Sequence, residues 1–268
     1  MAIVAGSRPE DRTLFRYQVD GHRATLTIDD PARRNPLSAS VMAKLRTAVD
    51  EAAADTQVRV LVITGAGDKA FSAGGDLSGG FVDDPLVRHK ARGALAATFR
   101  AMRRCGKPTV ARVNGAALGG GFGVAAACDI VIAAEHALMG TPEIDLALWP
   151  MMISAVLRDI VPRRALLEMM LTGRRLTAVE ARDMGLVSRV VAASDLDGAV
   201  DDIVEVLTAK SPVALRLGRD AYYAMLGMDF DAALDHLQSG LTALAMTDDA
   251  TEGVAAFVEK RKPRWSGR

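Results

Sequence analysis

Two glycine-rich segments and one glutamate carry the groups in this sequence that are best suited to chemistry. "AFSAGGD" spans residues 70–76 and "NGAALGGGFG" spans residues 114–123. Glycine loses more entropy on folding than any other residue, so such clusters indicate that something comes very close to the main chain. If N–H groups from both loops converge on one oxygen atom, they form an oxyanion hole that stabilises developing negative charge.

The glutamate is Glu143, which lies in the apolar segment "MGTPEIDLALWP". Burial in such surroundings raises the pKa of a carboxyl group toward neutrality, and this suits it to transfer protons. An isolated loop glutamate is more often simply solvated. The bulky Trp149 follows in the same segment and is expected either beside a substrate pocket or in the core.

Two other interpretations of the second glycine segment remain open. Residues 121–126 fit the pattern G-x-G-x-x-A, which binds dinucleotide phosphates when it follows a strand. The acidic residue expected about 20 positions later should end a second strand, whereas Glu143 follows Thr141 and Pro142 in a loop. The glycines could also serve only to pack a helix closely against a sheet.

The surrounding pattern predicts the elements that must position these groups. Alternation of apolar and polar residues on both sides of Asp20-Gly21 predicts a β-hairpin. Strands are expected at 58–65, 107–115, 129–135 and 186–192, and helices at 36–55, 85–104 and in most of the chain after Pro150. This order predicts an α/β core over residues 1–200 and a helical oligomerisation region over residues 201–268.

Composition excludes several classes of function. The 268 residues include 33 basic and 33 acidic side chains, and aromatic residues make up 4%. The balanced charge argues against nucleic acid or a membrane surface as a partner. Cys105 and Cys128 have no metal-binding or redox spacing, the histidines form no cluster, and no signal peptide is recognisable, so we expect a cytoplasmic protein without a metal site.

Five segments, in order along nearly the whole chain, resemble the enoyl-CoA hydratase/isomerase (crotonase) superfamily. They are "NPLSASVM", "AFSAGGDL", "VNGAALGGGFGVAAACDIVIAAEHALMGTPEIDLALWP", "LTGRRLTAVEARDMGLVSRVV" and "AFVEKRKPRW". The resemblance implies a spiral of ββα units with a C-terminal helical trimerisation region, assembled as a homotrimer or homohexamer. It also implies an acyl-CoA substrate whose coenzyme A is part of the substrate, so that no separate cofactor is expected.

The resemblance further implies roles for individual residues. The N–H groups of Gly75 and Gly120 match the oxyanion hole that holds the thioester carbonyl, and Glu143 matches a catalytic acid/base. The substrate-binding positions implied by the resemblance are Arg34, Ala73, Asp76, Leu77, Gly119, Gly123, Trp149, Phe257 and Lys260. Phe257 and Lys260 match C-terminal positions that often reach coenzyme A across a subunit interface.

The sequence departs from the family pattern at one catalytic position. Typical hydratases of this family have a second glutamate 20 residues before the one that Glu143 matches, and this chain has Gly123 there. Hydration uses two acid/base groups, whereas one carboxylate can move a proton from C2 to C4 of a 3-enoyl-CoA. The pattern therefore favours double-bond isomerisation over hydration, and a non-catalytic acyl-CoA-binding homologue is the alternative.

Overall fold

The computed structural model describes residues 14–76 and 85–268, and its larger sheet has six strands. In spatial order these strands are β1 (Phe15–Asp20), β2 (Arg23–Ile28), β3 (Val60–Gly65), β5 (Thr109–Val113), β7 (Ile130–Ala134) and β10 (Arg189–Val191). β1 and β2 form the predicted antiparallel hairpin, and Gly21 at its turn has a φ of 54°. The other neighbours pair in parallel, as expected for an α/β core.

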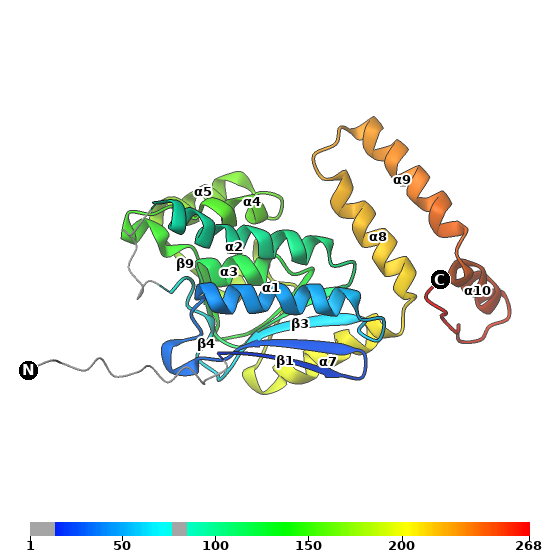
Figure 1. The fold of residues 1–268 in the computed structure, drawn as a ribbon, viewed down its shortest axis with the longest axis horizontal. Coiled ribbons are helices and arrows are strands. Elements are labelled where there is room, and N and C mark those ends of the chain that lie inside the picture. The colour runs from blue at the N-terminus through cyan, green and yellow to red at the C-terminus, as the bar shows by residue number, and fades with distance from the viewer. Residues whose placement is uncertain (1–13, 77–84) are drawn as a thin grey trace, which may run out of the picture.

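Helices cover both faces of this sheet (Figure 1). The main hydrophobic core lies on the side of α1 (Ala39–Ala54), α2 (Pro85–Arg104) and α3 (Gly120–Ala126). Helix α7 (Leu196–Thr208) packs on the opposite face and closes a second apolar cluster. In strand β3, Leu61 packs in the main core and Val62 packs in the second cluster, so both faces of the strand are buried.

A second, four-stranded sheet lies beside the larger one and was not expected as a separate element. Its strands are β4 (Ala70–Ser72), β6 (Ala116–Leu118), β8 (Leu138–Gly140) and β9 (Arg175–Thr177), in that order. The first three run in parallel, and β9 is antiparallel to β8. The two glycine-rich loops thus follow β4 and β6. The sequence places them directly after the strands at 58–65 and 107–115, and in the structure one short strand lies between each of those strands and its loop.

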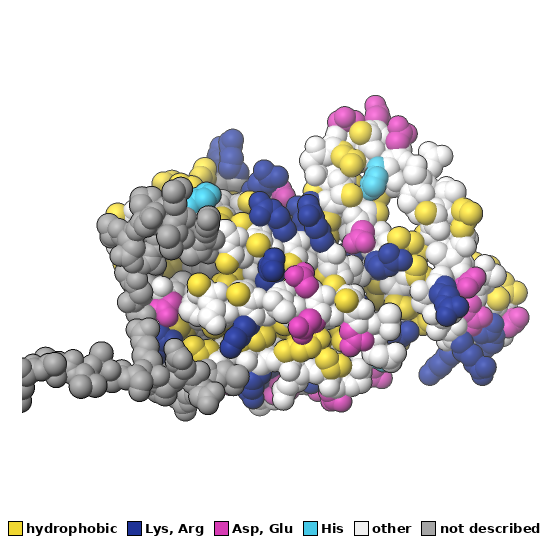
Figure 2. Space-filling model, in the orientation of Figure 1, with side chains coloured by type: hydrophobic (Ala, Val, Ile, Leu, Met, Phe, Trp, Pro, Cys, Tyr) yellow, Lys and Arg dark blue, Asp and Glu magenta, His cyan; other side chains and the backbone are white. Residues whose placement is uncertain are grey.

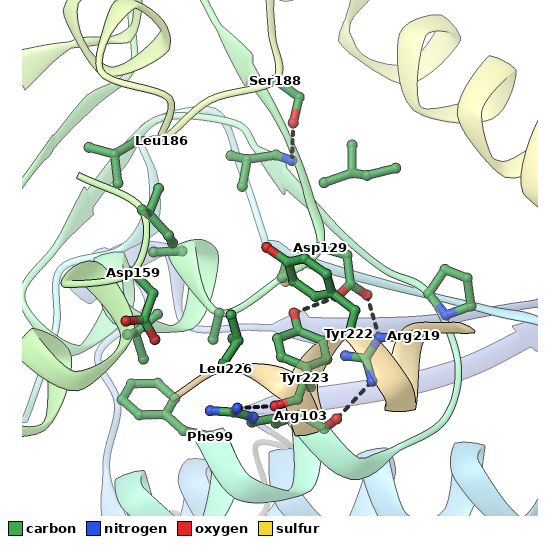
Figure 3. A pocket seen from close by; sticks show the side chains of 18 of the residues that line it. Phe99, Arg103, Asp129, Asp159, Leu186, Ser188, Arg219, Tyr222, Tyr223 and Leu226 are labelled. Carbon is green, nitrogen blue, oxygen red and sulfur yellow. Dashed lines mark hydrogen bonds and ion pairs between the residues drawn. The ribbon is translucent and has the colours of Figure 1, made fainter. Parts of the chain in front are cut away.

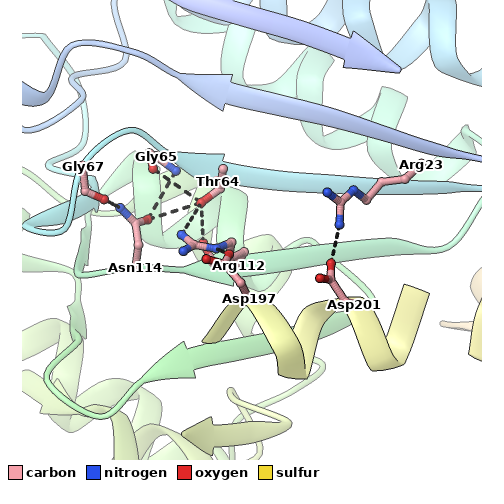
Figure 4. A network of polar contacts seen from close by, with 8 residues as sticks. All are labelled: Arg23, Thr64, Gly65, Gly67, Arg112, Asn114, Asp197 and Asp201. Atoms are coloured by element: carbon pink, nitrogen blue, oxygen red, sulfur yellow. Dashed lines mark hydrogen bonds and ion pairs between the residues drawn. The ribbon is translucent and has the colours of Figure 1, made fainter. Parts of the chain in front are cut away.

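The buried side-chain amide of Asn114 holds the start of this second sheet against the larger one. The side-chain nitrogen of Asn114 donates to the carbonyl of Gly67 at 2.7 Å and to that of Ala70 at 3.1 Å. Its side-chain oxygen accepts from Gly65 N at 3.3 Å (Figure 4). In the same view, ion pairs between Arg112 and Asp197 and between Arg23 and Asp201 attach α7 to the sheet.

The remaining elements of the core connect these layers. They are η1 (Pro31–Arg33), η2 (Pro142–Leu146), α4 (Met151–Leu157), α5 (Arg163–Thr172), α6 (Ala178–Asp183) and η3 (Ala193–Asp195). Helix α1 begins after Ser38, whose hydroxyl caps the helix by accepting a hydrogen bond from Val41 N at 3.2 Å. Helix α7 runs through residue 201, where the sequence predicts the division between core and C-terminal region.

Three C-terminal helices form an arm that extends from the core (Figure 1). They are α8 (Pro212–Met225), α9 (Phe230–Ala245) and α10 (Asp248–Val258). The carboxylate of Asp129 anchors α8, because it accepts hydrogen bonds from Arg219 Nε at 2.8 Å and from the Tyr223 hydroxyl at 2.6 Å (Figure 3). None of the described helices is both long enough and apolar enough to cross a membrane.

Candidate active site

Three loops that are far apart in the sequence meet at one edge of the second sheet. Gly75 follows β4, Gly119 and Gly120 follow β6, and Glu143 follows β8. These strands are parallel neighbours, so their carboxyl ends lie side by side at a spacing of about 4.8 Å. The topology therefore brings the predicted donors and the predicted acid/base together.

The loops of Gly75 and Gly120 touch. A Cβ atom placed on Gly120 would lie 4.0 Å from Gly75 N and 3.4 Å from Leu37 Cδ1. Leu37 holds the first loop in place, since its N–H donates to the carbonyl of Gly74 at 2.7 Å. Within residues 14–76 and 85–268, neither the Gly75 nor the Gly120 N–H donates a hydrogen bond to the protein. Gly120 opens α3, where backbone N–H groups have no partner within the helix.

Gly119 brings the Glu143 carboxylate against the same loop. Its φ of 52° lies in the region that glycine tolerates, and its N–H donates to the Gly140 carbonyl at 2.9 Å. A Cβ at this position would come within 3.0 Å of Glu143 Oε1. The carboxylate therefore packs directly on the backbone that precedes Gly120.

The Glu143 carboxylate lies in a desolvated environment. Burial raises the pKa of this group above its ordinary value. Its Oε2 atom is buried and has no hydrogen-bond partner among the described residues. A buried polar atom without a partner is rare in folded proteins and indicates a role beyond folding. An acid/base that accepts a proton from a bound molecule would have this arrangement.

The loop that precedes α1 reaches the same edge. Arg34 is exposed with a φ of 63°, and its carbonyl accepts from Ala73 N at 2.8 Å. Asp76, in the loop that follows β4, forms an ion pair with Arg33 of the loop before α1 at 3.2 Å. The exposed residues Arg34 and Ala73 are thus neighbours across two loops beside Gly75.

Asn35 positions this loop and was missed at the sequence level. It is fully buried, with a φ of 56°, and its side-chain nitrogen donates to the carbonyls of Ala66 and Ala70 at 2.9 and 2.7 Å. Asparagine is one of the few residues with side chains that readily adopt a positive φ. The polar residue in "RRNPL" was the available signal, although the sequence alone does not show that it is buried.

Gly123, which stands where typical hydratases of the family have a second glutamate, has apolar surroundings. A Cβ on Gly123 would lie 2.8 Å from Phe99 Cζ and 3.0 Å from Ile153 Cγ1. Asp145, the other carboxylate close to Glu143 in sequence, is exposed. Trp149 is half-buried and packs against the main core. Leu77 lies outside the described residues.

Phe257 and Lys260 are not near these loops within one chain. Phe257 ends the arm in α10 and is 85% exposed, and Lys260 follows it on the surface. Figure 1 places α10 and β4 at opposite ends of the long axis. A contribution of these two residues to the site would therefore require a second copy of the chain.

A cavity of about 920 Å³ lies between the core and α8 (Figure 3). Phe99, Met152, Asp129 and Tyr222 are among its lining residues, and none of the predicted site residues lines it. Across the described ranges, no group of three or more His, Cys, Asp and Glu side chains could hold a metal ion. The candidate site is accordingly the edge formed by the loops after β4, β6 and β8.

Comparison with known proteins shows which family this chain resembles over nearly its whole length. The sequence model of the family described as "Enoyl-CoA hydratase/isomerase" matches residues 22–268. A carnitinyl-CoA dehydratase of Salmonella paratyphi A is 34% identical over 249 residues, which cover 91% of this chain and 94% of that protein.

Solved structures of similar proteins confirm the predicted fold. The crystal structure of an enoyl-CoA hydratase of Mycobacterium smegmatis matches with a TM-score of 0.91 at 32% identity and covers 95% of this chain and 99% of its own. One of Bacillus anthracis matches with a TM-score of 0.90 at 31% identity, with 96% and 100% covered.

Proposed function

Because this chain belongs to the enoyl-CoA hydratase/isomerase family, we propose that it acts on an acyl-CoA thioester through an enolate held by the N–H groups of Gly75 and Gly120. Both N–H groups lack acceptors within the described chain, and the two loops are in contact. Such preorganised donors stabilise the negative charge that develops on the thioester oxygen when a proton leaves C2.

We assign the proton transfer to Glu143. The observation that carries the proposal is its half-buried carboxylate, which packs on Gly119 and has a buried oxygen, Oε2, without a partner among the described residues. In a 3-enoyl-CoA, this carboxylate removes a proton from C2, and the electron pair delocalises over the thioester oxygen and C4. Return of the proton to C4 moves the double bond from C3–C4 to C2–C3. One carboxylate suffices for this isomerisation, whereas hydration of a 2-enoyl-CoA uses a second polar group.

Coenzyme A is proposed to lie along the exposed loops of Arg34 and Ala73. Arg34 offers a guanidinium for its phosphates, and Asp76, Leu77 and Trp149 remain proposed substrate contacts. Arginine forms bidentate, charge-assisted hydrogen bonds with phosphate. Coenzyme A is part of the substrate, so the proposed reaction uses no separate cofactor. The two buried free cysteines are in keeping with a cytoplasmic location, which is also part of the proposal.

We expect purified protein to convert a 3-enoyl-CoA into the 2-enoyl isomer faster than it hydrates a 2-enoyl-CoA. The names of the relatives make hydration or dehydration the second candidate, so both substrates are needed. The measurement is ultraviolet absorbance of the conjugated thioester together with mass spectrometry of the products. Binding of coenzyme A without turnover of either substrate would contradict the proposal and favour the non-catalytic alternative.

The arm is proposed to form a homotrimer or a pair of trimers. Helix α9 has no buried residue, and the exposed apolar residues of the arm are Tyr222, Met228, Phe230, Leu234, Leu241, Met246, Val254, Phe257 and Val258. Figure 2 shows hydrophobic side chains on this arm. Exposed apolar area of this kind marks an interface. In such an assembly, Phe257 and Lys260 of one subunit could reach the coenzyme A of another.

Light scattering coupled to size-exclusion chromatography should accordingly give the mass of three or six chains. Replacement of Phe257 and Val258 by serine should shift the protein toward monomer, because these side chains are 85% and 72% exposed in a single chain. The same change at Val19, which is 45% exposed on the edge strand β1, provides a control and should leave the mass unchanged. A wild-type monomer at micromolar concentration would contradict this assembly.

A further inference from the structure

The space beside Gly123 is filled by carbon atoms. A Cβ there would meet Phe99 Cζ at 2.8 Å and Ile153 at 3.0 Å (Cγ1) and 3.5 Å (Cγ2), and these are its three nearest contacts. Ile153 in α4 is 3% exposed, and Phe99 in α2 packs against the main core. The glycine therefore leaves no gap, because apolar side chains from two other helices take the volume of the side chain that it lacks.

These side chains continue an apolar surface that begins at the proposed oxyanion donor. Leu95 is one turn before Phe99 on α2, and its Cδ2 lies 3.8 Å from a Cβ placed on Gly120. Residues four apart on a helix share one face, as do residues three apart such as Gly120 and Gly123. Leu95, Phe99 and Ile153 thus form one apolar wall along α3, which starts at Gly120 and passes Gly123.

The three atoms nearest to a Cβ at position 123 are all carbon atoms, which offer a water molecule no hydrogen bond. Leaving a buried polar group unpaired is costly, and a water needs two to four polar partners to occupy such a site. Glu143 is the one titratable side chain among the atoms nearest to a Cβ placed on Gly119 or Gly120.

Building on the proposed function, we propose that Phe99 and Ile153 determine whether the site isomerises a 3-enoyl-CoA or hydrates a 2-enoyl-CoA. The wall excludes the water whose hydroxyl would add to C3 of a 2-enoyl-CoA while its proton goes to C2. The proton taken from C2 by Glu143 therefore returns to carbon at C4, and no atom of water enters the product. The substrate class is a 3-enoyl-CoA thioester, and its product is the conjugated 2-enoyl isomer.

The test introduces a glutamate at position 123, either alone or together with a smaller residue in place of Phe99. Gly123→Glu alone should gain no hydration and should lower Tm, because Phe99 and Ile153 occupy the space. Gly123→Glu combined with Phe99→Ala should recover Tm and raise the ratio of hydration to isomerisation at least about tenfold. Gly198→Glu is the matched control, since a Cβ at that exposed helical glycine meets nothing within 4 Å, and both quantities should stay at their wild-type values.

The ratio is measured by mass spectrometry in H2¹⁸O, which labels the hydrated product and leaves the isomer unlabelled. Wild-type protein that hydrates as fast as it isomerises would overturn the role of the wall, even if the double variant fails to fold. A stable Gly123→Glu variant with hydratase activity would overturn it as well. Absence of turnover of both substrates by wild-type protein would instead contradict the proposed function itself.

Discussion

Replacement of Glu143 by glutamine should lower kcat for isomerisation by about two to four orders of magnitude, the usual contribution of a positioned acid/base group. Glutamine keeps the size of the side chain and cannot accept a proton from C2. The carboxylate packs against Gly119, so the isosteric change should leave the backbone and coenzyme A binding in place. Stopped-flow or steady-state assays of a 3-enoyl-CoA, with calorimetry of coenzyme A binding, measure the two effects separately.

Asp145→Asn is the matched control for this change. Asp145 is an exposed carboxylate two residues from Glu143, and its neutralisation should leave kcat within a few-fold of wild type. The pH dependence gives a second check, because burial raises the pKa of Glu143 and the base must be ionised to act. Wild-type kcat/KM should fall as the pH drops through that raised pKa, and a Glu143→Gln variant with undiminished activity would exclude the assigned role.

Gly120→Ala should reduce kcat/KM by about two to three orders of magnitude, because the N–H stays in place but the methyl group keeps the thioester oxygen from it, and losing one oxyanion hydrogen bond usually has an effect of this size. The added methyl group would lie 3.4 Å from Leu37 Cδ1 and 4.0 Å from Gly75 N. The methyl group therefore causes no clash with the protein, but it narrows the space between the N–H groups of Gly75 and Gly120. Tm should stay close to the wild-type value while turnover is lost.

Gly198→Ala in α7 is the control for this substitution. A Cβ at that position meets nothing within 4 Å, and alanine is the better helix former, so Tm should hold or rise slightly with full activity. Thermal unfolding and the isomerase assay on both variants separate a blocked oxyanion hole from a damaged fold. Unchanged activity of Gly120→Ala would show that the thioester oxygen does not lie between Gly75 and Gly120.

The sequence allowed prediction of the larger sheet because all of its strands except β10 have five or six residues, enough to show a pattern. Val60–Gly65 reads as a continuous apolar run, and β1 and β2 alternate around a glycine turn. The second sheet has strands of three residues, too short for any periodicity, and these are the strands that carry the site. Their existence depends on parallel pairing between segments that are distant in the sequence.

The sequence predicted the main residues of the candidate site but not the side chains that pack around them. Glu143, Gly75 and Gly120 follow from the glycine segments and from the resemblance, and the structure places them at one edge. Phe99 and Ile153 could not be predicted as neighbours of Gly123, because their contact depends on how α2 and α4 pack on α3. The assigned roles of the site residues stay predictions until the variants are assayed.

In the proposed chemistry, the loops that follow β4 and β6 supply main-chain groups, and side chains supply the rest. The two donors are peptide N–H groups, which every residue except proline supplies, so most substitutions leave the groups themselves in place. The acid/base and the apolar wall are side chains on other segments, Glu143 after β8 and Phe99 and Ile153 on α2 and α4. A few substitutions of these side chains can therefore exchange one reaction for another, while the groups that stabilise the enolate stay unchanged.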